Sequence, residues 1–158
     1  MPSSDIGTTL HVVLVAPEIP PNTGSIARLC AATGTRLHLI EPLGFSLDDR
    51  YLKRAGLDYW PYVDLQVHND WQQFRAPNPQ ARMHFFSARA ARSYLSVKYA
   101  KGDFLVFGSE TKGLPPALLT AHLDDLYVIP IASRHVRSLN LSNAVGIVVY
   151  EALRQLVA

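Results

Sequence analysis

The sequence predicts an α/β protein with a mainly parallel sheet flanked by helices. Short runs of β-branched and aromatic residues alternate with segments of helical pattern along the chain. Strands that alternate with helices are typical of parallel sheets, because parallel neighbours need a crossover connection and a helix supplies it. The length of 158 residues fits one such domain and is short for two.

The clearest strand opens the fold. Residues 10–15 read Leu-His-Val-Val-Leu-Val, a compact run that predicts a buried parallel strand. The proline-rich segment 16–21 predicts a stiff loop, because proline lacks the N–H that a helix or a sheet needs. Asn22 is a good N-cap for a helix that Gly34 ends, and a second strand is expected at 36–40.

The later elements continue the alternation. We expect strands at 65–68, 83–87, 104–108 and 126–129, and helices at 47–55, 69–75, 115–121 and 142–157. The last helix is unusual because its run Ala144–Tyr150 is apolar on every side. A helix of this kind is covered from more than one direction, and in so short a chain a second subunit would supply the cover. A homodimer is therefore expected.

Composition narrows the class of protein. Apolar residues make up 48% and charged residues 18%, a globular balance, so residues 1–158 are expected to form one domain with a disordered lead at 1–8. The single cysteine excludes an intrachain disulfide and indicates a reducing, cytoplasmic location. Neither a signal peptide nor an apolar run of about 18 residues is recognisable, so no membrane association is expected.

The formal charge of +2 does not by itself indicate a nucleic-acid binder. Any affinity for RNA would have to come from locally clustered arginines and lysines. Metal and nucleophile chemistry also lack support. The six histidines show no metal-ligand spacing, so no metal is expected, and no Gly-x-Ser-x-Gly elbow or Gly-x-Gly-x-x-Gly loop occurs.

Three loop-to-helix segments follow predicted strands, at the edge where ligands of open α/β sheets collect. The first is Asn22–Arg28. Gly24 leaves room for a close backbone contact, and Arg28 lies about two turns into the helix. A helix N-terminus with a guanidinium suits a phosphate or a carboxylate. Taken alone, an ordinary capped helix with a surface arginine explains the segment more simply.

The second segment is Phe107–Pro115. Its glycines are spaced as in a phosphate loop, but Leu114 and Pro115 stand where that loop needs Lys and Ser or Thr, which excludes an NTPase. Glycines after a strand suit a tight turn and a close ligand, and Glu110 is able to orient a basic partner. A glycine-rich turn with solvated charges is the alternative.

The third segment comprises 129–131 and 137–144. Hydroxyls and amides surround the start of the last helix, where they can cap it or bind the polar edge of a ligand. Capping by Ser142 would explain one of these residues. It would not explain Ser138, Asn140 and Asn143 together.

Taken together, the three segments resemble the three motifs of the SPOUT methyltransferases. They read Asn-x-Gly-x-x-x-Arg, Phe-Gly-x-Glu-x-x-Gly-Leu-Pro and Ser-x-Asn-Leu-Ser-Asn-Ala, in order, and the resemblance covers residues 10–155. The segments 17–24 and 54–59 resemble the small TrmL (YibK) subgroup, which methylates the ribose 2′-hydroxyl of the wobble nucleotide in leucine tRNAs. Ser109 and Leu139 stand where relatives often carry Pro and Met, and the loop 132–136 is a residue longer than expected.

The resemblance implies a deep C-terminal trefoil knot, S-adenosylmethionine as cofactor, a homodimer, and binding of the tRNA anticodon stem-loop. Carried over position by position, the cofactor contacts are Phe86, Gly108, Ile129, Ser138 and Leu139. Contacts with RNA are expected from Arg28, Lys112, Arg137 and Tyr150, with Lys53, Arg54 and Arg134 as further basic candidates. For Tyr150, a packed core tyrosine is the alternative.

The resemblance also implies three catalytic residues, Arg28, Asn22 and Glu110. A guanidinium is not normally deprotonated in proteins, so Arg28 is better suited to clamp a phosphate and stabilise developing alkoxide charge than to act as a base. Asn22 would hold Arg28 or the ribose, and Glu110 would orient the site. The alternatives are a relative that methylates another tRNA position or rRNA, a catalytically silent RNA-binding protein, and a small nucleotide-binding regulator.

Overall fold

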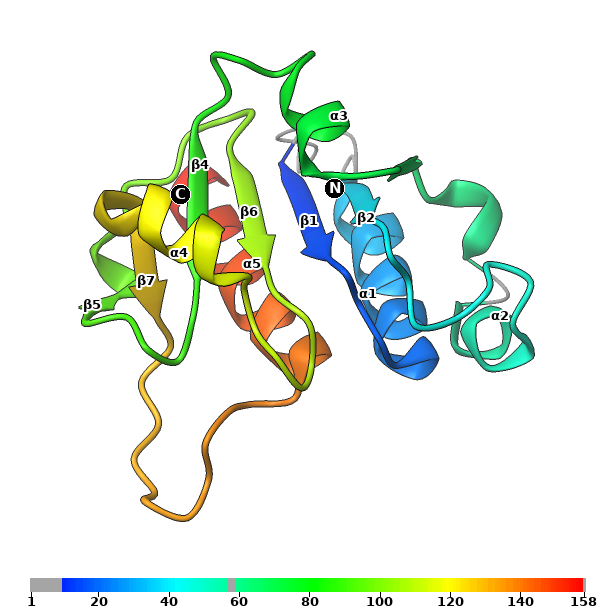
Figure 1. The fold of residues 1–158 in the computed structure, drawn as a ribbon. Helices are drawn as coiled ribbons and strands as arrows, with labels where there is room; N and C mark the ends of the chain where they lie inside the picture. Colours follow the sequence, from blue (N-terminus) through cyan, green and yellow to red (C-terminus); the bar gives the residue numbers. More distant parts are fainter. Residues whose placement is uncertain (1–9, 57–58, 158) are drawn as a thin grey trace.

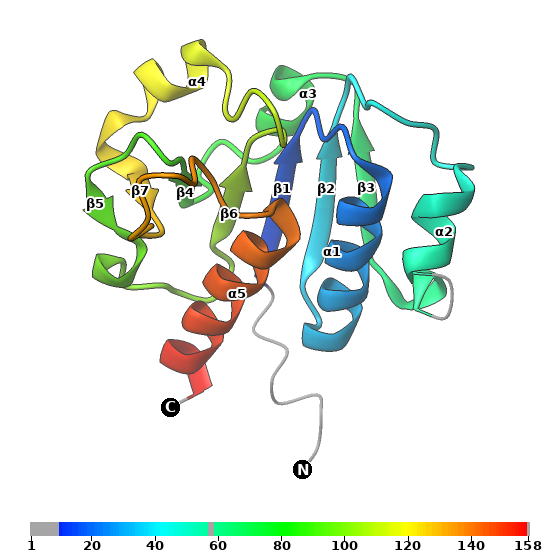
Figure 2. The same ribbon diagram turned by 90° about the horizontal axis from the view of Figure 1, so that it is seen from below.

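The computed structural model describes residues 10–56 and 59–157. A seven-stranded sheet in the order β3-β2-β1-β6-β4-β7-β5 lies between two layers of helices (Figures 1 and 2). All paired strands run parallel, which confirms the predicted α/β class. The expected disordered lead at 1–8 and part of the segment 54–59 lie outside the described residues.

Most predicted elements are present within a few residues of the expected bounds. The strands are β1 (His11–Val15), β2 (Arg36–Ile40), β3 (Leu65–His68), β4 (Met83–Phe86), β5 (Arg92–Ser93), β6 (Phe104–Phe107) and β7 (Leu126–Val128). The helices are α1 (Pro20–Thr33), α2 (Arg50–Gly56), α3 (Trp71–Arg75), α4 (Pro116–Ala121) and α5 (Leu141–Val157). The short strand β5 and the 3₁₀ turns η2 (Trp60–Tyr62), η3 (Tyr94–Ser96) and η4 (Leu123–Asp125) were not predicted.

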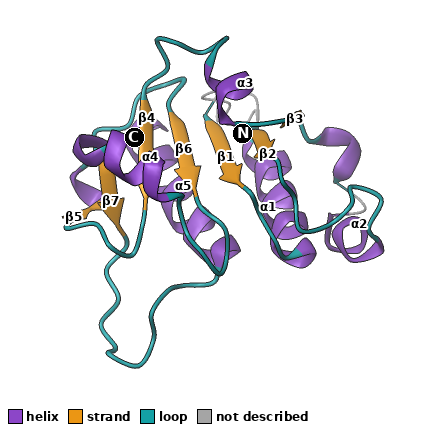
Figure 3. Cartoon of the chain, viewed as in Figure 1, coloured by secondary structure: helices purple, strands orange, loops and turns teal. Residues whose placement is uncertain are grey.

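The central strands are buried on both faces, as their continuous apolar runs require. Along β1, Val12 and Leu14 pack into the core beneath α1 and α5, whereas Val13 and Val15 pack into the core beneath α3 and α4. Each fully buried side chain of this kind contributes roughly 1.5–3 kcal/mol. The two cores cover both faces of the sheet. The loops that follow β1, β4, β6 and β7 leave it at one edge (Figure 3).

The start of α1 differs from the prediction. The helix begins at Pro20 rather than at Asn22, and its N-cap residue Ile19 makes no side-chain cap. Proline is well suited to a first turn because the N–H that it lacks has no partner there. Asn22 is instead buried inside the first turn. The predicted end is confirmed, since Gly34 has the left-handed φ of 67° and donates its N–H to Cys30 O.

The last helix, α5, has two apolar faces, as the sequence indicates. One face is buried against the sheet and α1 and includes Val145, Val148 and Ala152. The opposite face leaves Ile147 38% and Tyr150 56% exposed, so in this single chain the helix is covered from one side. Among the described residues, no helix is long and apolar enough to cross a membrane.

Candidate functional site

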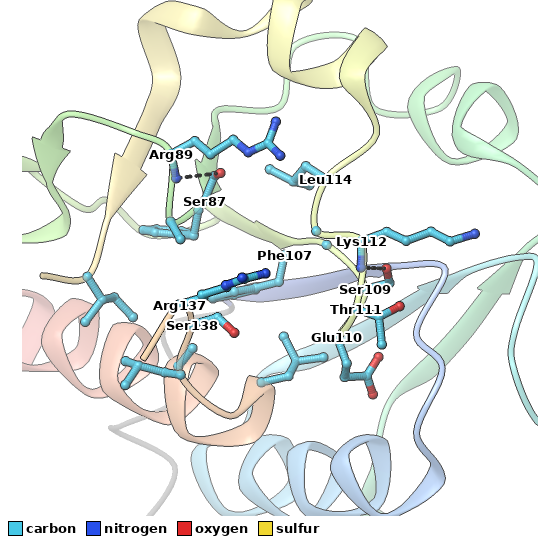
Figure 4. A pocket seen from close by; sticks show the side chains of 18 of the residues that line it. Ser87, Arg89, Phe107, Ser109, Glu110, Thr111, Lys112, Leu114, Arg137 and Ser138 are labelled. Carbon is cyan, nitrogen blue, oxygen red and sulfur yellow. Dashed lines mark hydrogen bonds between the residues drawn. The ribbon is translucent and has the colours of Figure 1, made fainter. Parts of the chain in front are cut away.

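A cavity of about 470 Å³ opens at the carboxyl edge of the sheet (Figure 4). This volume lies in the range of small-molecule sites. The loops after β4, β6 and β7 and the start of α5 form its walls. All five predicted cofactor contacts line it, namely Phe86, Gly108, Ile129, Ser138 and Leu139. The structure therefore brings these residues together around one space.

The loop after β6 is closed upon itself. Ser109 and Gly113 exchange two backbone hydrogen bonds, of 3.2 and 2.9 Å, and Gly113 has the left-handed φ of 68°. A Cβ on Gly108 would lie 2.0 Å from the carbonyl carbon of Gly113 and 2.1 Å from the nitrogen of Leu114. Gly108 is thus required first by the loop's own backbone, and only through that loop by anything bound in the cavity.

Glu110 supplies the cap that α1 lacks. Its carboxylate accepts hydrogen bonds from the backbone N–H groups of Glu18 and Ile19, both at 2.8 Å. It also accepts one from Asn22 Nδ2 at 3.2 Å. A carboxylate at a helix N-terminus is stabilised by the helix dipole as well as by these donors. Glu110 therefore fixes the loop after β1 to the loop after β6.

A second carboxylate, on the loop after β1, binds the loop after β6 in return. Glu18 accepts hydrogen bonds from the hydroxyl of Thr111 at 2.7 Å and from its backbone N–H at 3.3 Å. The Thr111 hydroxyl is the main cause that lowers the pKa of Glu18 below its ordinary value. The two loops thus form a reciprocal clasp. Sequence reasoning missed this role of Glu18 and Thr111 because neither residue forms a local motif.

A smaller cavity of about 190 Å³ joins all three predicted segments. It is lined by Ile19, Asn22, Glu110, Ser138, Leu139, Asn140 and Leu141. Asn22 is the link between the segments, because its Oδ1 accepts from Asn140 Nδ2 at 3.1 Å while its own amide donates to Glu110. Asn140 was not among the predicted site residues, although the amide-rich third motif pointed to it.

Asn140 also caps α5. Its Oδ1 accepts from the backbone N–H groups of Ser142 at 2.9 Å and Asn143 at 3.3 Å. The suggested cap at Ser142 is therefore wrong, because the helix begins one residue earlier, at Leu141. One asparagine side chain thus both starts the last helix and reaches the first.

Three cationic side chains line the large cavity. Lys112 and Arg137 were predicted to contact RNA. Arg89 was missed, because it lies in an irregular loop after β4 that carries no motif. Figure 4 shows Arg137 and Ser138 entering from the last loop and Arg89 from the loop on the other side of the cavity. A bound anion would meet positive charge from both sides.

Two predicted residues stand apart from the cavities. Arg28 lines neither cavity, and its guanidinium carbon lies 4.7 Å from the ring centre of Tyr59. Tyr150 lines neither cavity and lies on the outer face of α5. The structure therefore unites Asn22 and Glu110 but does not bring Arg28 into contact with them.

The part of the chain that the structure describes contains no set of side chains arranged to bind a metal ion. There, no group of three or more His, Cys, Asp and Glu side chains is arranged to hold an ion. The large cavity combines apolar walls with cations, and the small one offers amides and a carboxylate. Two adjoining spaces of different polarity suit a transfer between two different substrates.

The chain is similar along most of its length to known RNA methyltransferases. Residues 9–150 match the SpoU rRNA Methylase family. A relative from Burkholderia ambifaria, named tRNA (cytidine(34)-2′-O)-methyltransferase, is 53% identical over 149 residues, which cover 92% of this chain and 94% of that protein.

Two solved structures share the fold. One, described as structural insights into the 2-OH methylation of C/U34 on tRNA, has a TM-score of 0.90 and 49% identity, and the match covers 94% of this chain and 97% of that one. The other is an AdoMet-bound rRNA methyltransferase from Sinorhizobium meliloti, with a TM-score of 0.84 and 25% identity, and covers 100% of this chain and 62% of that one.

Proposed function

Because the chain belongs to the SpoU rRNA methylase family, we propose that it transfers a methyl group from S-adenosylmethionine to a ribose 2′-hydroxyl of tRNA. The nucleotide is the wobble nucleotide, a cytidine or a modified uridine, as the names of the similar proteins suggest. Leucine isoacceptors are the first substrates to test. One observation carries the proposal: the three motif loops meet where the two cavities adjoin.

The residues of the large cavity fit the cofactor. Phe86, Leu114 and Ile129 offer apolar surface to an adenine, and Ser138 offers a polar contact to an amino-acid moiety. Gly108 keeps the loop after β6 in the shape that forms one wall. When bound, S-adenosylmethionine supplies an activated methyl group on a sulfonium.

The chain's own residues then have to hold the ribose in line with that methyl group. Asn22 and Asn140 present amides to the small cavity, where we place the ribose. Both oxygens of Glu110 already accept hydrogen bonds, so we assign this residue to orientation rather than to removal of the hydroxyl proton. Arg28 is assigned to a phosphate beside the target nucleotide, with Lys112, Arg137 and Tyr150 as further RNA contacts.

The assembly is part of the proposal. We propose that residues 1–158 act as one cytoplasmic domain and pair as a homodimer through the exposed apolar face of α5 around Ile147. Sedimentation at micromolar concentration should give twice the mass of the chain. A monomer at every concentration tested would contradict the pairing.

We also propose that the C-terminal part forms the trefoil knot that the resemblance implies. The connection between β5 and β6 touches the C-terminal half of α5, because Gln155 accepts from Tyr99 N at 2.9 Å and donates to Val97 O at 3.0 Å. A chain pulled from both ends should stop short of its full extended length, since a tightened knot retains residues. Full extension would exclude the knot.

The experiment that tests the activity uses bulk tRNA. The protein is incubated with labelled S-adenosylmethionine and tRNA, and the modified nucleoside is mapped by mass spectrometry. We expect a 2′-O-methyl group at the wobble nucleotide, and Arg28→Ala serves as the inactive control that still binds S-adenosylhomocysteine. A product at another tRNA position or in rRNA would support the alternative substrate, and no product from any RNA would end the enzyme proposal.

A further inference from the structure

The Arg28 guanidinium lies over the ring of Tyr59. We propose that the Tyr59 ring is a positioning platform that keeps the Arg28 guanidinium in place at the surface, where it contacts an RNA phosphate. The inference rests on the proposed function, because it assigns to Tyr59 a role that acts through Arg28. It explains why a predicted catalytic residue lies outside both cavities.

The geometry of the pair is that of a cation–π contact. The guanidinium carbon of Arg28 lies 4.7 Å from the centre of the Tyr59 ring, within the range of about 6 Å for such contacts. In the stacked form of such a contact, one face of the planar guanidinium rests on the ring and the N–H donors at its edge stay available. An arginine can therefore rest on the ring and still donate two parallel hydrogen bonds to a phosphate.

The platform itself is anchored. Tyr59 precedes the 3₁₀ turn η2, and its carbonyl accepts from Tyr62 N at 2.9 Å. Trp60 and Val63, on either side of Tyr62, pack against the core beneath α1 and α5. The ring is thus carried by a turn that packs against the core. Such a support reduces the number of rotamers that Arg28 samples, which is large for a long exposed side chain.

The position of Arg28 on α1 suits a phosphate near the target ribose. Asn22, which lines the small cavity, precedes Arg28 on the same helix by about 9 Å along the axis, at 1.5 Å per residue. A strand of RNA that places a ribose beside Asn22 and runs along α1 would bring a neighbouring phosphate towards the guanidinium. By positioning the guanidinium, Tyr59 then strengthens the contact between Arg28 and that phosphate.

The test compares variants of one ring. Tyr59→Leu should lower kcat/KM for tRNA about three- to fivefold, the scale of an exposed cation–π contact. Tyr59→Phe keeps the ring and should restore the wild-type value. Tyr62→Leu is the matched control, because Tyr62 lies on the same turn, is 78% exposed and should leave activity unchanged. Affinity for S-adenosylhomocysteine should be the same in all three variants.

A double-mutant cycle shows whether the ring acts through Arg28. In an Arg28→Lys background, whose ammonium lacks the planar guanidinium, Tyr59→Leu should cost clearly less than in wild type. Equal losses in both backgrounds, or a Tyr59→Phe variant as weak as Tyr59→Leu, would overturn the inference. If wild-type protein methylates no tRNA, the proposed function fails. If it does methylate tRNA and Tyr59→Leu matches wild type, only the platform fails.

Discussion

Two hydrogen-bond networks join distant parts of this chain, and they are built from opposite kinds of groups. The edge network links Asn22, Glu110 and Asn140 through a carboxylate and two amides beside open cavities. The histidine ladder links His11 to His38 at 2.9 Å and His38 to His68 at 3.0 Å, across β1, β2 and β3. The first network is built around a carboxylate, and the second consists of imidazole rings.

The difference follows from the surroundings of each network. Glu110 lies at a helix start, where its carboxylate accepts hydrogen bonds from two backbone N–H groups. The ladder packs instead on Phe74 and Phe104, and burial lowers the pKa of His38 to about 3 and that of His11 to about 4. The edge network is therefore suited to a ligand, and the ladder to the stability of the neutral fold.

The largest effect is expected at Glu110. Glu110→Ala removes the acceptor for three donors and releases the loop after β1 from the loop after β6. Methyl transfer to tRNA should fall about 100-fold or more, because misplaced catalytic groups lose transition-state contacts. Single-turnover kinetics with saturating cofactor measures this. Asp64→Ala, which removes an exposed carboxylate paired with Arg36 just before β3, is the control, and equal rates for the two variants would refute the role of Glu110.

The next effect concerns the wall of the large cavity. Gly108→Ala places a Cβ where the carbonyl carbon of Gly113 would lie 2.0 Å away, so the loop has to move. Affinity for S-adenosylhomocysteine, measured by calorimetric titration, should drop about tenfold or more. Gln66→Ala, at an exposed position of the edge strand β3, is the control. Unchanged affinity in Gly108→Ala would remove this loop from the cofactor site.

The edge network was largely predictable from sequence, and the physical reason is the parallel sheet. Segments that follow parallel strands leave the same edge, so three motifs that begin at Asn22, Phe107 and Ser138 had to meet there. The details were not predictable. The cap of α1 comes from Glu110, a residue of a different loop, and no local pattern around Pro20 shows it.

The ladder left no signal in the sequence. Its histidines lie on three separate strands with no common spacing, so their contact depends on the register of β1, β2 and β3. The register is fixed by packing of whole strands rather than by any one residue. The stacking of Arg28 on Tyr59 was missed for a similar reason, because an irregular connection carries the ring.

The third effect is a change in the dependence of stability on pH. The histidines of the ladder have lowered pKa values in the folded protein, so below about pH 6.5 the unfolded chain binds more protons. Stability is therefore complete above that pH and falls as the pH falls towards about 4. Arg36 adds to the lowering for His11 and His38, whereas Asp64 opposes it for His11.

His38→Gln tests this dependence, since an amide can donate and accept but does not titrate in this range. The slope of unfolding free energy against pH between 4 and 6 should decrease by about 1.4 kcal/mol per pH unit. Urea unfolding at several pH values gives the slope. His135→Gln, in an exposed loop, should leave it unchanged. A wild-type slope in His38→Gln would mean that the ladder is not what couples folding to protons.

The smallest effect is expected on the other half of the loop clasp. Thr111→Val removes the hydroxyl that bonds Glu18 at 2.7 Å but keeps the backbone donor and the Glu110 contacts. The pKa of Glu18 should rise towards its ordinary value, because that hydroxyl is the main cause of its lowering. Methyl transfer should fall less than about threefold, since the exposed contact is only one of several across the junction. NMR titration of the carboxylates measures the pKa of Glu18, and single-turnover kinetics measures methyl transfer. Thr120→Val, on the exposed side of α4, is the control and should change neither. A loss as large as that of Glu110→Ala would mean that Glu18 and Thr111, rather than Glu110, determine how the two loops meet.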